Sequence, residues 1–143
     1  MKYSLQNKPS ASAFSKLTSM LCATFLITTP LFADSHALTE EELNALLSGK
    51  TVRGIYLDNN SPFTRYYDED GEVRQRVEKE TEEGTWFIDT QGRRCIVWSG
   101  KEKKCRVIMK DKELYKEFTI MNNNKPKAVV IYNKITEGNP NGL

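Results

Sequence analysis

The sequence predicts a mainly β protein, an antiparallel up-and-down meander of about eight short strands that forms a small barrel or sandwich after one short N-terminal helix. Two observations predict this fold class. Beyond residue 50, short runs rich in β-branched and aromatic residues alternate with turn formers such as Asp70-Gly71 and Ser99-Gly100. The connections between the runs are short, which leaves no room for the crossovers that parallel strands require.

The expected helix begins after Thr39, which can cap its first turn. Glu42 stands three residues later, at the spacing of a capping box, and Gly49 marks the end of the helix. A helix this short is marginal alone, so we expect one of its faces to dock on the β-rich part. Three leucines share that face, namely Leu43, Leu46 and Leu47.

Eight strands are expected after the helix, each bounded by residues that favour turns. They lie near residues 51–57, 63–68, 72–78, 84–89, 93–98, 103–109, 114–121 and 127–133. We interpret the acidic run 78–83 as a linker between two of them. Residues 34–137 are expected to form a single β-rich domain, followed by a flexible tail at 138–143 that is rich in Gly and Asn.

Two turn geometries are available to the hairpin around Asp70. A two-residue turn would place Arg65 opposite Arg76, a like-charge pair that costs stability. A three-residue loop ending in Gly71 avoids this pair and puts glycine where a left-handed backbone is needed. We expect the second geometry, which pairs Phe63 with Val77 and Tyr67 with Val73 and leaves Thr64, Tyr66, Arg74 and Arg76 on the other face.

The second hairpin centres on Gly100, and symmetric pairing there puts Cys95 opposite Cys105, within reach of a disulfide. These are the only cysteines after residue 33, and two such cysteines bond to each other in an oxidising compartment. A redox pair is less well supported, because a Cys-x-x-Cys spacing is absent. A metal site is not expected, because the only histidine, His36, lies far along the chain from both cysteines.

The first 33 residues have the order of an export signal. Three lysines and no acid precede or enter a short apolar run, and Ala33 offers a cleavage point, with a second cut after Ala37 left open. The apolar run is too short to span a bilayer. We therefore expect a cleaved signal peptide, a periplasmic or secreted protein and no transmembrane segment after cleavage, with a retained amphipathic anchor as the alternative.

Cleavage would change the charge balance. The whole chain has 21 basic and 19 acidic residues, whereas residues 34–143 have 18 basic and 19 acidic residues. A nearly neutral domain has no general attraction for phosphate backbones or anionic lipid. Nucleic acid is therefore not expected as a partner, while an envelope or protein ligand and the oligomeric state stay open.

One face of the second hairpin, opposite the cysteines, carries Arg94, Trp98, Lys104 and Arg106. On an outward face these residues would form a basic patch with an aromatic plate, able to bind phosphates, acidic glycans or an acidic protein. The plainer interpretation is a solvated face whose long side chains cover Ile96 and Trp98. An outward Trp is uncommon, so this patch is the candidate binding site.

The sequence shows no catalytic apparatus. His36 lies in the lead-in to the domain, and the acidic clusters at 68–72 and 78–83 are explained by solvated turns. No catalytic residue, metal or cofactor is therefore expected. Two alternatives from other classes remain. One is an envelope structural or assembly subunit with an exposed apolar patch. The other is a small hydrolase that uses barrel-mouth groups, with Tyr66, Tyr67, Glu82 and Glu83 as candidates.

A family resemblance rests on three motifs: the turn Tyr67-Asp68-Glu69-Asp70-Gly71, then Gly84-Thr85-Trp86, then Cys95, Trp98 and Cys105. This pattern resembles small secreted bacterial families of unknown function and covers about residues 47–121. The resemblance implies a lipocalin-like small β-barrel and no established activity. In true lipocalins the Gly-x-Trp belongs to the first strand, whereas Trp86 falls in mid-chain, so the resemblance does not extend to a lipocalin-sized pocket. We expect an exported, non-catalytic binding barrel stabilised by one disulfide.

Overall fold

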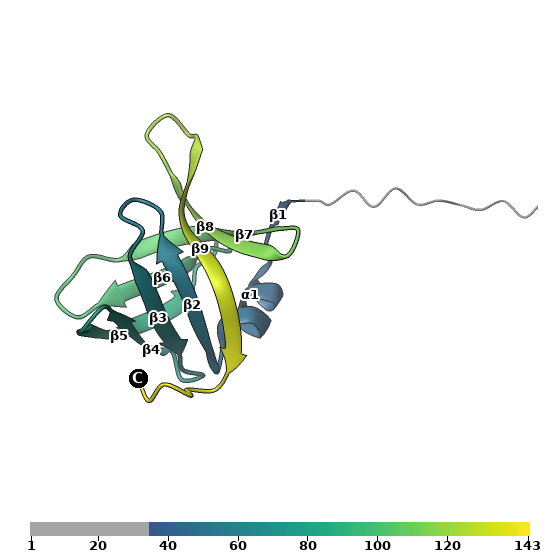
Figure 1. The fold of residues 1–143 in the computed structure, drawn as a ribbon. Helices are drawn as coiled ribbons and strands as arrows, with labels where there is room; N and C mark the ends of the chain where they lie inside the picture. The colour runs from purple at the N-terminus through teal and green to yellow at the C-terminus, as the bar shows by residue number, and fades with distance from the viewer. Residues whose placement is uncertain (1–34) are drawn as a thin grey trace, which may run out of the picture. The chain divides into compact units, whose positions relative to one another are not determined.

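The computed structural model describes residues 35–143, which form a closed antiparallel barrel of eight strands (Figure 1). The predicted signal peptide at 1–33 and its cleavage point after Ala33 lie outside the described residues. A two-residue strand, β1 (His36–Ala37), and a helix, α1 (Glu40–Leu47), precede the barrel. The barrel strands are β2 (Lys50–Tyr56), β3 (Pro62–Tyr67), β4 (Glu72–Val77), β5 (Glu80–Ile88), β6 (Arg94–Trp98), β7 (Lys104–Asp111), β8 (Leu114–Ile120) and β9 (Pro126–Glu137).

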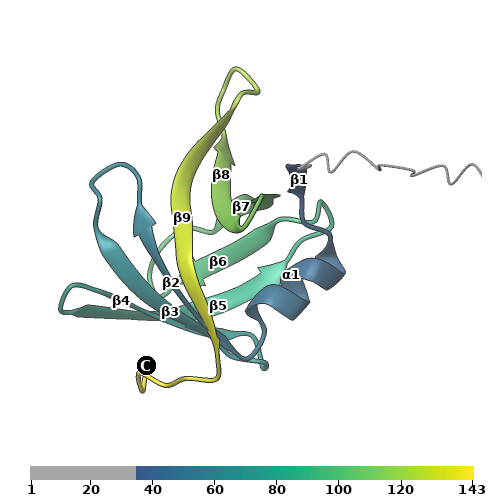
Figure 2. The same ribbon diagram turned by 45° about the vertical axis from the view of Figure 1, so that its right-hand side comes forward.

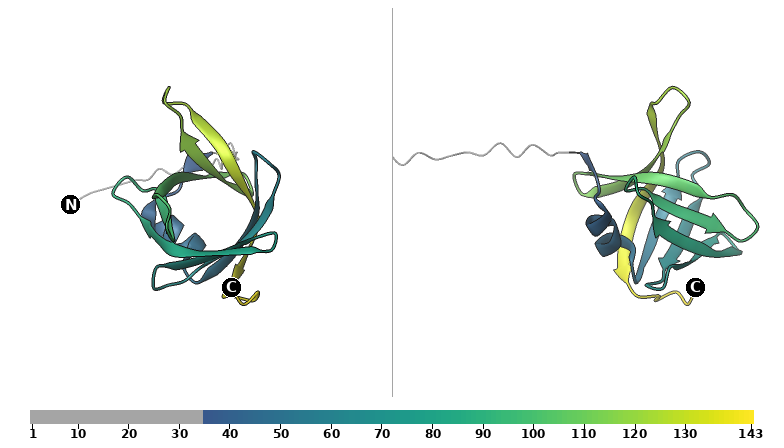
Figure 3. Two further views of the ribbon diagram at one scale, coloured as in Figure 1. Left: turned by 90° about the vertical axis from the view of Figure 1, so that its left-hand side faces the viewer. Right: turned by 180° about the vertical axis from the view of Figure 1, so that it is seen from behind.

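Each barrel strand pairs with the next along the chain, and β9 returns to pair with β2 (Figure 3). This last pairing closes the ring, so the fold is a barrel and not a sandwich. The loops after β2, β4, β6 and β8 consequently lie at one end of the barrel, which we call the open end. Helix α1 and the turn between β3 and β4 belong to the opposite end, which we call the closed end.

Both predicted hairpin registers are confirmed. Phe63 lies opposite Val77, and Gly71 takes a φ of 88° in the loop between β3 and β4. Cys95 lies opposite Cys105 on β6 and β7, and a disulfide joins them. Local turn chemistry therefore sets the pairing of neighbouring strands, as the sequence indicates.

Helix α1 also begins as its sequence indicates. Thr39 accepts a hydrogen bond from the Glu42 backbone, and the Glu42 side chain accepts one from the Thr39 backbone, which completes the capping box. Leu43 and Leu47 are fully buried, so the apolar face of the helix is docked on the domain. Within residues 35–143 no helix is long and apolar enough to cross a membrane.

Two strands are longer than expected. Strand β5 begins at Glu80, so most of the acidic run interpreted as a linker is strand, and only Glu78 and Lys79 form the turn. Strand β9 continues to Glu137 instead of ending near residue 133. Pairing with β4 and with β2 extends these strands, although their charged ends lack the apolar alternation by which a strand is recognised.

Two glycines allow neighbouring strands to approach closely as the sheet curves. A Cβ on Gly84 would lie 2.3 Å from the Val97 carbonyl oxygen on β6. A Cβ on Gly54 would lie 2.4 Å from the Ile131 carbonyl oxygen on β9, where the β2–β9 register shifts. A side chain at either position would overlap backbone, so both glycines are required by the ring geometry.

The closed end of the barrel holds an apolar core. Tyr67, Val73 and Leu43 are each at most 1% exposed and belong to one cluster. Trp86 packs edge-on against Tyr67 with ring centroids 5.3 Å apart, and its Nε1 donates to the Asp68 carbonyl oxygen at 2.9 Å. This end is therefore filled by side chains.

The residues after β9 make several specific contacts. The Gly138 N–H donates to the Gly49 carbonyl oxygen (2.8 Å), and Arg53 Nη2 donates to Asn141 Oδ1 (2.6 Å). Arg74 Nη1 donates to Leu143 O (3.1 Å). The flexibility expected for residues 138–143 stays a prediction, and these contacts are the ones that such motion would have to break.

Candidate functional site

The candidate binding patch lies on the inside of the barrel. Arg94 is 3% exposed and Trp98 is 8% exposed, and both line a cavity of about 530 Å³ together with Lys104 and Arg106. The expected outward face is thereby corrected. Both faces of this hairpin carry apolar side chains, so alternation along its strands did not reveal which face lies inside the ring.

The cavity occupies the half of the barrel nearer the open end. Its wall includes Asn59 in the loop after β2, Lys101 in the loop after β6, and the start of β9 around Ala128. Ile96 and Trp98 provide an apolar side of the wall. The volume falls within the range typical of small-molecule sites, and the mixed lining matches their usual composition.

Arg65 on β3 forms the floor of the cavity and is fully hydrogen bonded. Its Nε and Nη2 donate to Gln75 Oε1 at 2.8 and 2.6 Å, and Nη2 also donates to the Tyr56 hydroxyl at 3.0 Å. Its Nη1 donates to the Tyr67 hydroxyl at 2.8 Å and to Glu117 Oε1 at 3.0 Å. These bonds use all five N–H groups of the guanidinium, so Arg65 has no donor left for a ligand.

Glu117 on β8 is the buried carboxylate of this layer. Its Oε1 also accepts from the Tyr132 hydroxyl at 2.6 Å, and its Oε2 forms an ion pair with Arg94 Nη2. Burial alone would raise the pKa of Glu117, but the charges of Arg94 and Arg65 and the hydrogen bonds lower it to about 2. Glu117 is therefore ionised and serves two arginines at once.

Arg94 on β6 is as deeply buried as Arg65 but is much less satisfied. Its polar contact is the ion pair with Glu117, and its Nε has no hydrogen-bond partner among the described residues. Burial is the largest influence and acts to lower the pKa of Arg94, but Glu117, Tyr67 and Tyr132 together raise the pKa above its usual value. Arg94 therefore stays charged with donor capacity unused, which is uncommon for a buried side chain.

Arg106 on β7 is half-buried in the cavity wall, and no acidic side chain of residues 35–143 lies at ion-pair distance from it. Its Nη1 donates to the Thr119 hydroxyl and to the Cys105 carbonyl oxygen, both at the long distance of 3.3 Å. Burial, followed by the repulsion of Arg94 and Arg65, lowers the pKa of Arg106 despite the attraction of Glu117. Its surroundings in the cavity wall therefore disfavour the charged form of the Arg106 side chain.

The polar layer was not foreseen, although the confirmed register of the first hairpin contained its signal. Phe63 and Tyr67 share the inner face of β3, so Arg65 between them must point inward as well. Gln75 lies directly opposite Arg65 on β4. The polar pair of Arg65 and Gln75 therefore lies between two apolar pairs on the inner face, and this arrangement indicated a buried polar layer.

The four candidates for a hydrolase do not meet at one place. Successive residues of a strand point to opposite faces, which separates Tyr66 from Tyr67 and Glu82 from Glu83. Tyr67 is buried and hydrogen bonded to Arg65, and Glu82 lines the cavity in an ion pair with Lys101. The structure therefore brings only one of the two predicted carboxylates into the cavity.

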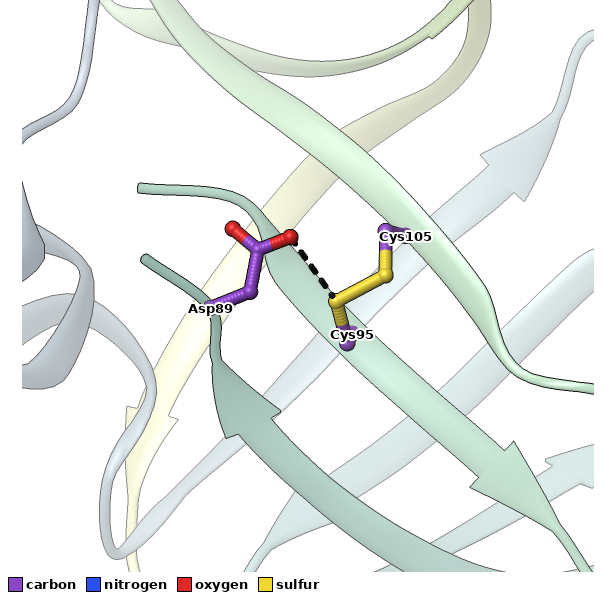
Figure 4. A group of neighbouring side chains, drawn as sticks. All are labelled: Asp89, Cys95 and Cys105. Carbon is purple, nitrogen blue, oxygen red and sulfur yellow. Dashed lines mark hydrogen bonds between the residues drawn. A yellow bond between two sulfur atoms is a disulfide. The ribbon is translucent and has the colours of Figure 1, made fainter. Parts of the chain in front are cut away.

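Asp89 lies beside the disulfide, with its Oδ2 3.7 Å from Cys95 Sγ (Figure 4). The sulfurs of Cys95 and Cys105 are bonded to each other and are not free thiolates. The Asp89 carboxylate accepts from the Arg93 side chain at 2.8 Å and from the Gln91 backbone at 3.0 Å. Asp89, Cys95 and Cys105 lie close enough together to resemble a set of metal ligands. However, both sulfurs are in the disulfide, and the carboxylate already accepts hydrogen bonds.

Comparisons with known proteins add no family to this description. No protein-family model matches the chain, and neither the curated proteins nor the solved structures contain a match to it. The class that the fold defines is a small disulfide-containing eight-stranded β-barrel.

Proposed function

We propose that this protein is an exported, non-catalytic barrel that holds a small ligand in the cavity of its open end, as a member of the small secreted lipocalin-like families that it resembles. The single observation that carries the proposal is the cavity of about 530 Å³, with Ile96 and Trp98 on one side and cations on another. A closed barrel with one filled end and one hollow end is an arrangement that suits ligand storage or transport.

The disulfide supports export. Cys95 and Cys105 are bonded to each other, and such bonds persist in oxidising compartments. Intact mass measurement of the protein from fractionated cells tests this part. Export predicts a chain that has lost its first 33 or first 37 residues and has no free thiol, and full-length material with reduced cysteines in the cytosol would contradict it.

The placement of the carboxylates supports a binding role over hydrolysis. Glu117 is ionised and held by Arg65 and Arg94, so it has no proton to donate as a general acid at neutral pH. Glu82 is the ion-pair partner of Lys101. Turnover by the purified protein that disappears in either Glu82→Gln or Glu117→Gln would instead support the hydrolase.

Ligand binding is tested by intrinsic fluorescence, because the chain has two tryptophans and only Trp98 lines the cavity. The oxidised protein is titrated with eight-carbon amphiphiles that differ in head group: octanoate, octanol and octylammonium. We expect at least one to give a saturable change that is lost in Trp98→Phe and kept in Trp86→Phe. No saturable change with any of them, or a change kept in Trp98→Phe, would overturn the proposed site.

An assembly subunit is the second candidate, and the hairpin of β8 and β9 favours it. This hairpin extends beyond the rest of the ring (Figure 2), and Ile120 and Met121 near its tip are 52% and 45% exposed. Assembly through a second copy predicts concentration-dependent dimers in light scattering that disappear in Ile120→Asn. A monomer at high concentration would remove this candidate.

A further inference from the structure

The walls of the cavity carry an excess of positive charge. Six cationic side chains line it against three carboxylates, although residues 34–143 as a whole have one more acid than base. The cations are Arg65, Arg94, Lys101, Lys104, Arg106 and Lys127, and the carboxylates are Asp58, Glu82 and Glu117. The imbalance is therefore local to this cavity and not a property of the domain.

The imbalance is most costly at the buried floor. Arg65 and Arg94 are only 2–3% exposed and share the single charge of Glu117, so one buried positive charge has no counter-charge within the described part of the chain. Leaving a buried charge unpaired is among the most destabilising arrangements in proteins. The burial of Arg94 is explained if a bound ligand supplies the missing negative charge.

The cavity offers a place for that charge above Arg94. Arg106 and Lys104 lie on the adjacent strand β7, where Arg94 pairs with Arg106 and Ile96 with Lys104. Arg106 donates to two neutral oxygens at 3.3 Å, and stronger acceptors would displace these long hydrogen bonds readily. Trp98 and Ile96 line the same cavity beside these cations and can cover an apolar group.

We infer that the ligand is a small organic anion, whose oxyanion head group binds between Arg106 and Lys104 over Arg94 and whose apolar body packs on Ile96 and Trp98. The inference rests on the proposed ligand-binding function and specifies the chemistry of the ligand. Carboxylates and phosphates share this chemistry, because both present oxygen pairs that accept from a guanidinium.

The amphiphile series separates the inference from the function on which it rests. Octanoate and octyl phosphate are titrated against octanol and octylammonium, which keep the chain length and change the head-group charge. We expect at least one anion to bind on the order of tenfold tighter than octanol. Octylammonium, which carries a positive head group, should bind weakest. Preference for octanoate or for octyl phosphate identifies the head group.

Variants of matched charge test the location. Arg106→Gln should weaken anion binding on the order of tenfold and leave octanol binding unchanged. Arg76→Gln removes the same charge from β4 outside this cavity, and it should change neither. Thermal melts test whether both variants fold. If Arg106→Gln does not fold, Lys104→Gln serves as the cavity variant in its place.

The outcomes are distinct. Equal binding of octanol and the anions would overturn the inference and leave the ligand-binding proposal standing. Equal loss of anion binding in Arg106→Gln and Arg76→Gln would also overturn it, because the effect would then be that of net charge. Failure of every amphiphile to bind would remove the proposed function and the inference together.

Discussion

The closed and open ends of this barrel are built from the same eight strands but are completed in different ways. At the closed end, Leu43 and Leu47 from α1 meet Tyr67, Val73 and Trp86, and apolar side chains fill the space. At the open end, charged side chains surround a cavity of about 530 Å³. Side chains therefore fill the closed end. At the open end the described residues leave a cavity unfilled and an excess of positive charge uncompensated.

Two buried arginines mark the boundary between these ends. Arg65 forms the floor of the cavity and has every N–H group hydrogen bonded. Arg94 faces the cavity and has an Nε without a partner among residues 35–143. Equal burial with unequal satisfaction distinguishes a guanidinium that holds the fold together from one that is available to something else.

The largest effect is expected from Glu117→Gln, which removes the carboxylate shared by the two arginines. Two buried cations would then lie in one layer without a counter-charge, at a cost of about 4 kcal/mol in the free energy of unfolding. Urea denaturation at neutral pH measures it. Glu113→Gln, in the exposed turn before β8, is the control and should cost less than about 0.5 kcal/mol. Equal costs would show that the polar layer contributes little.

Leu43→Ala tests the closed end. Leu43 is fully buried, so its truncation leaves a cavity and should lower the unfolding free energy by about 3 kcal/mol. Leu114→Ala is the control, because Leu114 is 45% exposed and should cost less than about 0.5 kcal/mol. A small effect of Leu43→Ala in the same denaturation experiment would mean that α1 is not part of the core.

Acid should weaken the polar layer selectively. The pKa of Glu117 is lowered to about 2 from an ordinary value of 4.5, so its stabilisation is complete above the ordinary value and is lost as the pH falls toward 2. Between about pH 5 and about pH 3 the loss is about 2 kcal/mol. Unfolding free energies of the parent protein and Glu117→Gln across this range give the difference. Parallel pH profiles would contradict the assignment.

The smallest effect sharpens the comparison of the two arginines. Arg65→Met removes the donor for Tyr56, Tyr67 and Gln75, whereas Arg94→Met removes one ion pair and relieves the excess charge. Arg65→Met should therefore cost between about 1 and 2 kcal/mol more than Arg94→Met in urea denaturation. The reverse order would mean that Arg94 is the structural arginine of the pair.

Neighbouring strand pairs were predictable because their determinants are local. The loop ending in Gly71 and the symmetric hairpin around Gly100 fixed which residues lie opposite one another, including Cys95 and Cys105. The capping box from Thr39 to Glu42 similarly defined the start of α1. Each of these features depends on residues that lie close together in the sequence.

The site was less predictable because it depends on closure of the ring. The Arg65–Glu117 contact joins residues 52 positions apart, and the β2–β9 pairing joins residues farther apart still. The inward direction of Arg94 was missed because charged residues were expected to face solvent. Only the closed barrel shows that its inner face is apolar at the closed end and charged at the open end.

The return of β9 to β2 also bears on how the chain reaches this structure. Every other pairing in the ring joins consecutive strands and closes only a short loop, whereas Lys50 must meet Glu137 across almost the whole domain. The entropy of that closure is lost before its contacts form. We therefore expect an open, curled ribbon of hairpins to precede the native ring during folding, with the joining of the two edges as the slow step.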